Sequence, residues 1–152
     1  MPELIPYNDF SKFRLDQFCS GEIFKTGAAI WEWMGGEWYC DAIGFTWFGR
    51  LDGSPNETGC LEIDLSDLPQ SESAAVLASL RLPLASGMNY DSVVRVLGEP
   101  SNTLAFVDDR KTYEFEVGSA ETYQVSCTIQ NDDGLIFVSV IREDVLQAIE
   151  AL

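Results

Sequence analysis

The chain has 152 residues, of which 25 are acidic and 9 basic, so its net charge is −16, and it contains no histidine. This charge argues against recognition of nucleic acid or an anionic membrane through a basic surface; it permits a basic partner and also suits simple solubility. The length and the hydrophobic content of 46% predict a single globular domain over residues 1–152.

The N-terminal region predicts a cytoplasmic protein that starts with a polar lead-in and a short helix. Residues 1–9 contain neither a basic region nor an apolar leader, and no apolar run is long enough to span a bilayer. Asn8 or Asp9 is a candidate helix cap. The aromatic residues that follow have helix-like spacing and are typical of core positions: Phe10, Phe13 and Phe18.

An aromatic block follows at residues 27–51 and contains all 4 tryptophans. Gly35-Gly36 lies between two aromatic runs and predicts a two-residue hairpin turn, because glycine tolerates positive φ. Tryptophan and tyrosine are enriched in binding hot spots, although a sheet–helix core would use the same side chains. Our candidate partner-binding residues are the aromatic and acidic side chains of this block: Trp31, Glu32, Trp33, Glu37, Trp38, Tyr39, Asp41 and Trp47.

The middle of the chain predicts a strand, a short helix and then a second helix. Apolar residues alternate with acidic ones over 61–65, which is typical of a half-buried strand, and Ser71 is a candidate cap for the first helix. Asn89 is expected to cap the second helix, which Gly98 and Pro100 close. Its apolar stripe is Met88, Val93, Val94, Val96 and Leu97.

The C-terminal part predicts consecutive antiparallel strands over residues 103–141 and a terminal helix over 144–152. Asn131-Asp132-Asp133-Gly134 is a strong hairpin turn. In residues 135–141 apolar side chains occur at both odd and even positions, which predicts a central strand covered on both sides. The fold class is therefore α+β, a mostly antiparallel β-sheet with short helices packed on one face. Two similar helix-plus-four-strand halves, 8–66 and 71–142, are an open alternative to an undivided architecture.

Part of this region resembles a known protein-binding unit. Gly87-Met88, Tyr90-Asp91-Ser92-Val93 and Leu97-Gly98-Glu99-Pro100 are followed by aromatic strands and an Asp-Gly hairpin. This pattern, over about residues 84–141, is similar to the repeat unit shared by the β-lactamase inhibitory protein and the small lipoprotein of the outer-membrane barrel-assembly machinery. The resemblance implies a sheet with a concave, aromatic-lined binding surface, as in small bacterial immunity-type proteins. We expect the chain to differ from these two proteins in having neither a signal peptide nor a lipidation site.

The residues offer little for catalysis. Without histidine there is no Ser–His or Cys–His pair, and phosphate-binding glycine motifs are missing from the sequence. We therefore expect no catalytic residues, no cofactor and no metal. The cysteines lack a C-x-x-C spacing, which favours buried reduced thiols, with disulfides as the alternative in an exported chain: Cys19, Cys40, Cys60 and Cys127.

The function expected from these features is that of a non-enzymatic, cytoplasmic protein-binding protein. Its most concrete form is a bacterial immunity or inhibitor protein that occludes a basic protein partner, such as a toxin. One alternative is a carbohydrate-binding or carbohydrate-acting domain that uses Glu32 and Glu37 among the tryptophans. Another is a structural accessory subunit. The sequence leaves the oligomeric state and the binding face open.

Overall fold

The structure, a computed structural model, describes residues 2–13, 24–31, 35–40, 44–49 and 57–151, and between residues 24 and 49 it describes the backbone alone. The strands of its eight-stranded sheet are β1 Phe24–Trp31, β2 Gly35–Cys40, β3 Gly44–Gly49, β4 Glu57–Asp64, β5 Asn102–Val107, β6 Arg110–Val117, β7 Tyr123–Gln130 and β8 Gly134–Arg142. The described helices are α1 Tyr7–Ser11, α2 Gln70–Ser79, α3 Tyr90–Leu97 and α4 Glu143–Glu150.

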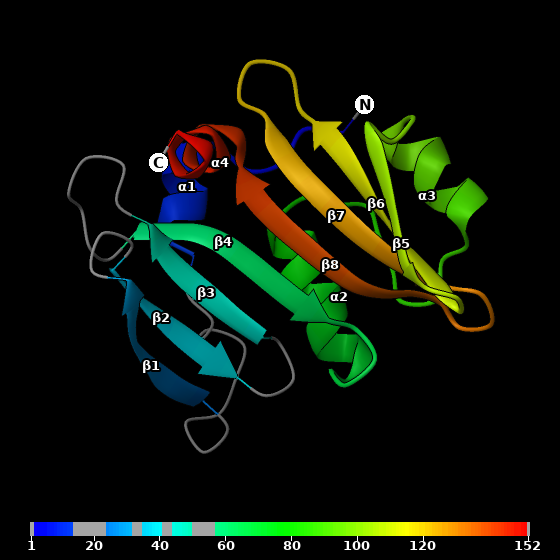
Figure 1. The fold of residues 1–152 in the computed structure, drawn as a ribbon, viewed down its shortest axis with the longest axis horizontal. Coiled ribbons are helices and arrows are strands. Elements are labelled where there is room, and N and C mark those ends of the chain that lie inside the picture. The colour runs from blue at the N-terminus through cyan, green and yellow to red at the C-terminus, as the bar shows by residue number, and fades with distance from the viewer. Residues whose placement is uncertain (1, 14–23, 32–34, 41–43, 50–56, 152) are drawn as a thin grey trace.

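The sheet is antiparallel throughout, in the order β1-β2-β3-β4-β8-β7-β6-β5. In Figure 1, α2 lies behind the sheet and α3 lies at its right-hand end, beside β5. The predicted α+β class, with a mostly antiparallel sheet and short helices, is therefore confirmed. One helix departs from the predicted arrangement: α4 packs on the opposite face, where Val145 contacts Cys60 and Ile141.

The main core lies between the sheet and the layer formed by α1, α2 and α3. Along β7 every second side chain is buried, as the alternation of apolar and polar residues predicts. β4 and β8 pair at the centre of the sheet, where Leu61 lies opposite Val140 and Ile63 opposite Val138. Because these side chains are all buried, the junction between the first four and the last four strands belongs to the core. Whether the two halves are a repeat stays a prediction.

The helix predicted after Asn89 is α3, and the structure confirms both of its ends. The Ser92 amide donates to the Asn89 side-chain oxygen at 2.8 Å, and Gly98 closes the helix with a φ of +89°. Val93 and Leu97 are buried in the core. The rest of the predicted apolar stripe is partly buried against that core: Met88, Val94 and Val96.

The turn predicted at Gly35-Gly36 is wrong, although β1 and β2 do form an antiparallel pair. Both glycines belong to β2, and Gly35 is paired with Trp31 of β1. The connection is residues 32–34, which lie outside the described residues. Glycine pairs indicate turns through local φ freedom, whereas the register of a hairpin is set by pairing along both strands.

The predicted helix caps at Asn8 or Asp9 and at Ser71 are also wrong. α1 follows Pro6 and α2 follows Pro69, and neither entrance has a side-chain cap hydrogen bond. These prolines have φ values of −58° and −54°, which the pyrrolidine ring favours and which direct the chain into a helix without a polar cap.

The first residues are not the polar lead-in that the sequence predicts. Leu4 and Ile5 are buried in the core, and the Tyr123 hydroxyl donates to the Ile5 carbonyl at 2.6 Å. The guanidinium of Arg142 lies 4.3 Å from the ring centroid of Tyr7 and adds a cation–π contact. The N-terminal segment is thus part of the packed structure.

β8 is a central strand, as predicted for residues 135–141, but only one of its two sides is covered along its whole length. β8 lies between β4 and β7, and Leu135, Val138 and Val140 are buried on the helix side. On the other side Phe137 and Ser139 remain partly exposed, and only the end of the strand, at Ile141, contacts α4. Eight-residue α4 is too short to cover the strand, since a helix rises about 1.5 Å per residue and a strand about 3.4 Å.

Candidate functional site

The part of the sheet that no described helix covers forms a surface that we call the open face. It comprises the partly exposed and exposed side chains of β4, β8, β7 and β6 that alternate with the buried ones. The strand register arranges most of them in three adjacent rows, which are Cys60–Ile141–Gln124–Glu116, Glu62–Ser139–Ser126–Glu114 and Asp64–Phe137–Thr128–Thr112. Beyond the third row, Gln130 of β7 is paired with Arg110 of β6.

The carboxylate of Glu114, in the middle row, accepts hydrogen bonds from two neutral side chains. The side-chain amide of Asn102 donates to Glu114 at 2.8 Å, and that of Gln124 donates at 2.9 Å. The hydroxyls of Thr112 and Thr128 form a cross-strand hydrogen bond of 2.9 Å. These neutral contacts leave the Glu114 negative charge in place and fix its position, so this part of the open face is both ordered and acidic.

Further carboxylates extend the negative charge toward α4. Burial raises the pKa of Glu143, and repulsion from Glu116 and Glu150 raises it further. The neighbourhood of Glu116 therefore disfavours additional negative charge. A cation brought to this position would relieve the repulsion between these side chains.

The backbone register places the predicted aromatic residues at different positions in the same sheet. Glu37 is paired with Trp47 and Trp47 with Cys60, so this row continues into the first row of the open face. Trp38 is instead paired with Thr46, whose neighbour on β4 is the buried Leu61.

The remaining candidates are spread over the β1–β2 hairpin and beyond it. Trp31 is paired with Gly35, and Tyr39 is paired with Phe45 of β3. Three candidates lie outside the described residues: Glu32, Trp33 and Asp41. The register thus brings Glu37 and Trp47 into line with the open face and leaves Trp38 in the adjacent row.

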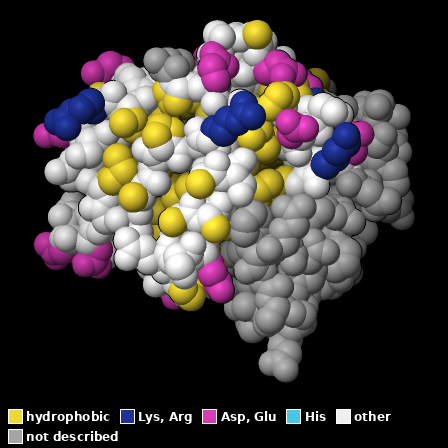
Figure 2. Space-filling model, turned by 180° about the vertical axis from the view of Figure 1, so that it is seen from behind, with side chains coloured by type: hydrophobic (Ala, Val, Ile, Leu, Met, Phe, Trp, Pro, Cys, Tyr) yellow, Lys and Arg dark blue, Asp and Glu magenta, His cyan; other side chains and the backbone are white. Residues whose placement is uncertain are grey.

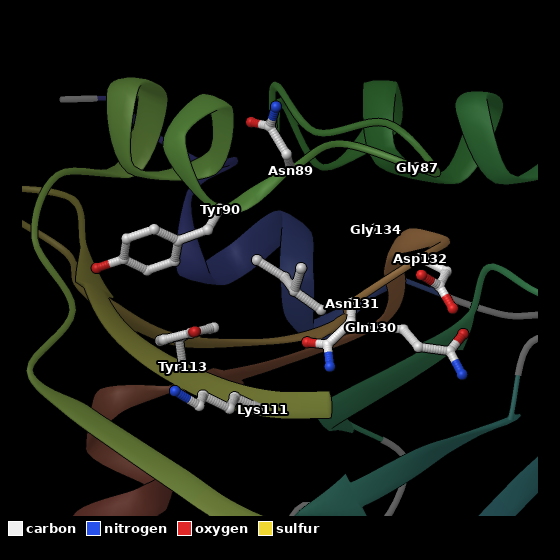
Figure 3. Close-up of a pocket in the computed structure, with 10 residues that line it drawn as sticks. Gly87, Asn89, Tyr90, Lys111, Tyr113, Gln130, Asn131, Asp132 and Gly134 are labelled. Atoms are coloured by element: carbon white, nitrogen blue, oxygen red, sulfur yellow. The ribbon is translucent and has the colours of Figure 1, made fainter. Parts of the chain in front are cut away.

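A separate hollow of about 290 Å³ lies on the helix side, between the start of α3 and the ends of β6 and β7. Tyr90 lies over Tyr113 there, with ring centroids 4.6 Å apart (Figure 3). Lys111 extends beside Tyr113, while Asp132 lies at the other end of the hollow (Figure 3). Because the two ends of the hollow carry opposite charges, it does not favour ligands of one sign of charge.

The described part of the helix side also has mixed chemistry. Hydrophobic side chains gather in the middle of the face, with acidic and basic side chains around them (Figure 2). The open face differs in having its acidic side chains in adjacent register rows, which makes it the better candidate for recognition of a partner with one sign of charge.

Sequence reasoning missed most of the open face, including Glu62, Glu114, Glu116 and Phe137. The alternation of apolar and polar residues in 61–65 and in the last strands does reveal which side chains share a face. It does not reveal that β4 and β8 are neighbours, because that pairing joins segments far apart in the chain.

No group of histidine, cysteine and carboxylate side chains within the described residues is arranged to hold a metal ion. None of the described helices is long and apolar enough to cross a membrane. The chain matches no family model, no curated protein and no solved structure.

Proposed function

We propose that this protein is a non-enzymatic, cytoplasmic binding protein of the immunity or inhibitor type, which uses its open face to occlude a basic protein partner. The observation that carries the proposal is the set of carboxylates in adjacent rows of that face, at Glu62, Asp64, Glu114 and Glu116. A partly exposed apolar side chain, Phe137, lies beside Asp64 in the third of these rows.

The electrostatics support a basic partner. A net charge of −16 attracts a cationic protein over a distance set by ionic strength. The face is predominantly acidic, and its basic residue on β6, Arg110, is already ion-paired with Asp109. Phe137 supplies apolar area beside Asp64 in the third row, and apolar side chains that become fully buried in a contact carry much of the binding energy. The register row that contains Cys60 continues to Trp47 of the aromatic block.

The test is capture of partners from the native host, with mass-spectrometric identification and then titration of the purified partner. We expect binding to weaken strongly between about 0.01 M and 1 M salt, because the Debye length falls from about 30 to 3 Å. Glu116→Lys should weaken binding, whereas Glu99→Lys is the matched control, since Glu99 is exposed beside α3 on the helix side.

Two results would contradict the proposal. One is that no protein is captured reproducibly under low-salt conditions. The other is a captured partner whose affinity is indifferent to salt and changes equally in the two lysine variants, because such a partner would not recognise the acidic open face.

A further inference from the structure

β5 ends the sheet, and its outer side has no backbone partner among the described residues. The strand is hydrogen-bonded to β6 alone, through pairs such as Asn102 with Glu114 and Leu104 with Thr112. An edge strand of this kind presents a row of unpaired N–H and C=O groups to solvent, and these groups are a template for a further strand.

No side chain of β5 is charged, although the pairing of β5 with β6 is irregular between Leu104 and Val107. Natural edge strands carry charged residues, lysine above all, whereas Asn102–Val107 contains no charged residue. The exposed large hydrophobic side chains within the described residues are both in this strand: Phe106 is 85% exposed and Val107 56%. β1, at the other end of the sheet, does contain a lysine, Lys25.

We propose that β5 pairs antiparallel with β5 of a second copy of this chain, which joins the two sheets edge to edge in a symmetric dimer. A basic partner would gain no ion pair from an uncharged strand. Two copies with a net charge of −16 each repel one another, and the repulsion is smallest where the contact itself carries no charge.

The charges next to the strand favour the antiparallel arrangement. Asp108 and Asp109 follow β5 directly, and Asp109 is partly neutralised by Arg110, whose Nε lies 3.0 Å away. Antiparallel pairing places the aspartates of the two copies at opposite ends of the joined strands, roughly 20 Å apart for six residues. Parallel pairing would place them side by side.

The contact is small, which predicts a weak and concentration-dependent dimer. Pairing of one short strand, with Phe106 and Val107 beside it, buries less than the roughly 1,200 Å² of total surface typical of stable complexes. Its dependence on salt has the opposite sign to that of the proposed basic partner, because screening removes the repulsion between two acidic copies. The two proposals can therefore fail independently.

The test is sedimentation velocity of the purified full chain over a wide concentration range, at low and at high salt. We expect self-association that tightens at least about fivefold at high salt. Phe106→Lys should weaken it at least about tenfold, since it places a lysine on the edge where the side chain is exposed. Ala78→Lys, on an exposed position of α2, adds the same charge and should associate like the original chain.

Three outcomes would overturn the proposal. The chain remains monomeric at the highest concentration and salt, or it associates but Phe106→Lys and Ala78→Lys behave alike. The third is a chain that stays monomeric while Phe106→Lys abolishes binding of a captured protein, which would assign the β5 edge to that partner. Circular dichroism of both variants confirms that they are folded before the comparison is made.

Discussion

Gly134, at the start of β8, lies so close to the backbone of Gly87 that a Cβ atom at Gly134 would overlap the Gly87 carbonyl oxygen. Hydrogen bonds join the same two segments: the Gly87 amide donates to the Leu135 carbonyl at 2.9 Å, and the Leu135 amide donates to the Met88 carbonyl at 2.8 Å. The stretch that precedes α3 is therefore anchored to the β7–β8 turn.

This contact predicts that Gly134→Ala is strongly destabilising. Gly134 has a φ of +74°, which costs an alanine about 1 kcal/mol, and the overlap with Gly87 adds about 2 kcal/mol of overpacking. We expect a loss of about 3 kcal/mol in the free energy of unfolding, measured by urea denaturation.

Gly87→Ala is the matched control for this prediction. Gly87 has a similar φ of +85°, but a Cβ atom there would lie at an ordinary contact distance of 3.7 Å from the Asp133 carbonyl oxygen. Its expected cost is the conformational part alone, about 1 kcal/mol. Equal losses in the two variants would show that the close approach at Gly134 contributes nothing.

The cap of α3 gives a second prediction. Asn89→Ala removes the acceptor for the Ser92 amide and should lower the free energy of unfolding by about 1 kcal/mol. Asn89→Ser keeps a side-chain acceptor at the same position and should retain most of that stability. Thermal and urea denaturation of both variants check the difference, and an alanine variant as stable as the serine variant would contradict the role of the cap.

These two sites also show what the sequence could predict. The cap at Asn89 and the closure at Gly98 were predictable because both depend on residues within one helix length. The contact of Gly134 with Gly87 was not, since the sequence explains Gly134 fully as a turn residue. Its second role comes from a segment 47 positions away that only the fold brings near.

The same limit applied to the candidate site. The alternation of apolar and acidic residues in 61–65 predicts that Glu62 and Asp64 share the solvent-exposed side of a strand. Their neighbours Ser139 and Phe137 depend on the antiparallel pairing of β4 with β8. The partner-binding residues were predicted in the aromatic block because its tryptophans can be recognised from the sequence alone. A face made of side chains from four strands can be recognised only once the strand register is known.

A third prediction concerns stability at alkaline pH. Cys127 is a free thiol that is fully buried in β7, and burial raises its pKa to about 12 from an ordinary value near 9. The unfolded chain loses this proton at a lower pH than the folded chain does, so the unfolded state binds fewer protons above pH 9. The stability from the neutral thiol is present below that pH and is lost as the pH rises toward 12.

Cys127→Val separates this contribution from the other groups that titrate in the same range. We expect the free energy of unfolding of the original chain to fall more steeply between pH 9 and pH 12 than that of the valine variant. Urea denaturation at several pH values measures both slopes. Parallel pH profiles would show that the Cys127 thiol ionises equally easily in the folded and the unfolded states.

The last prediction separates the roles of Phe137 and Glu116 on the open face. If the open face binds a basic partner, Phe137→Ala should lower the affinity by about 2 kcal/mol, roughly thirtyfold, because it truncates an apolar side chain that the contact buries. Most of this loss should come from faster dissociation.

Glu116→Gln should instead slow association and reduce its dependence on salt, since a charge near the rim acts mainly during the encounter. Surface plasmon resonance with the purified partner at two salt concentrations resolves both rates. A Phe137→Ala variant with unchanged dissociation would place the contact elsewhere, because an apolar anchor that is buried on binding cannot be removed without shortening the life of the complex.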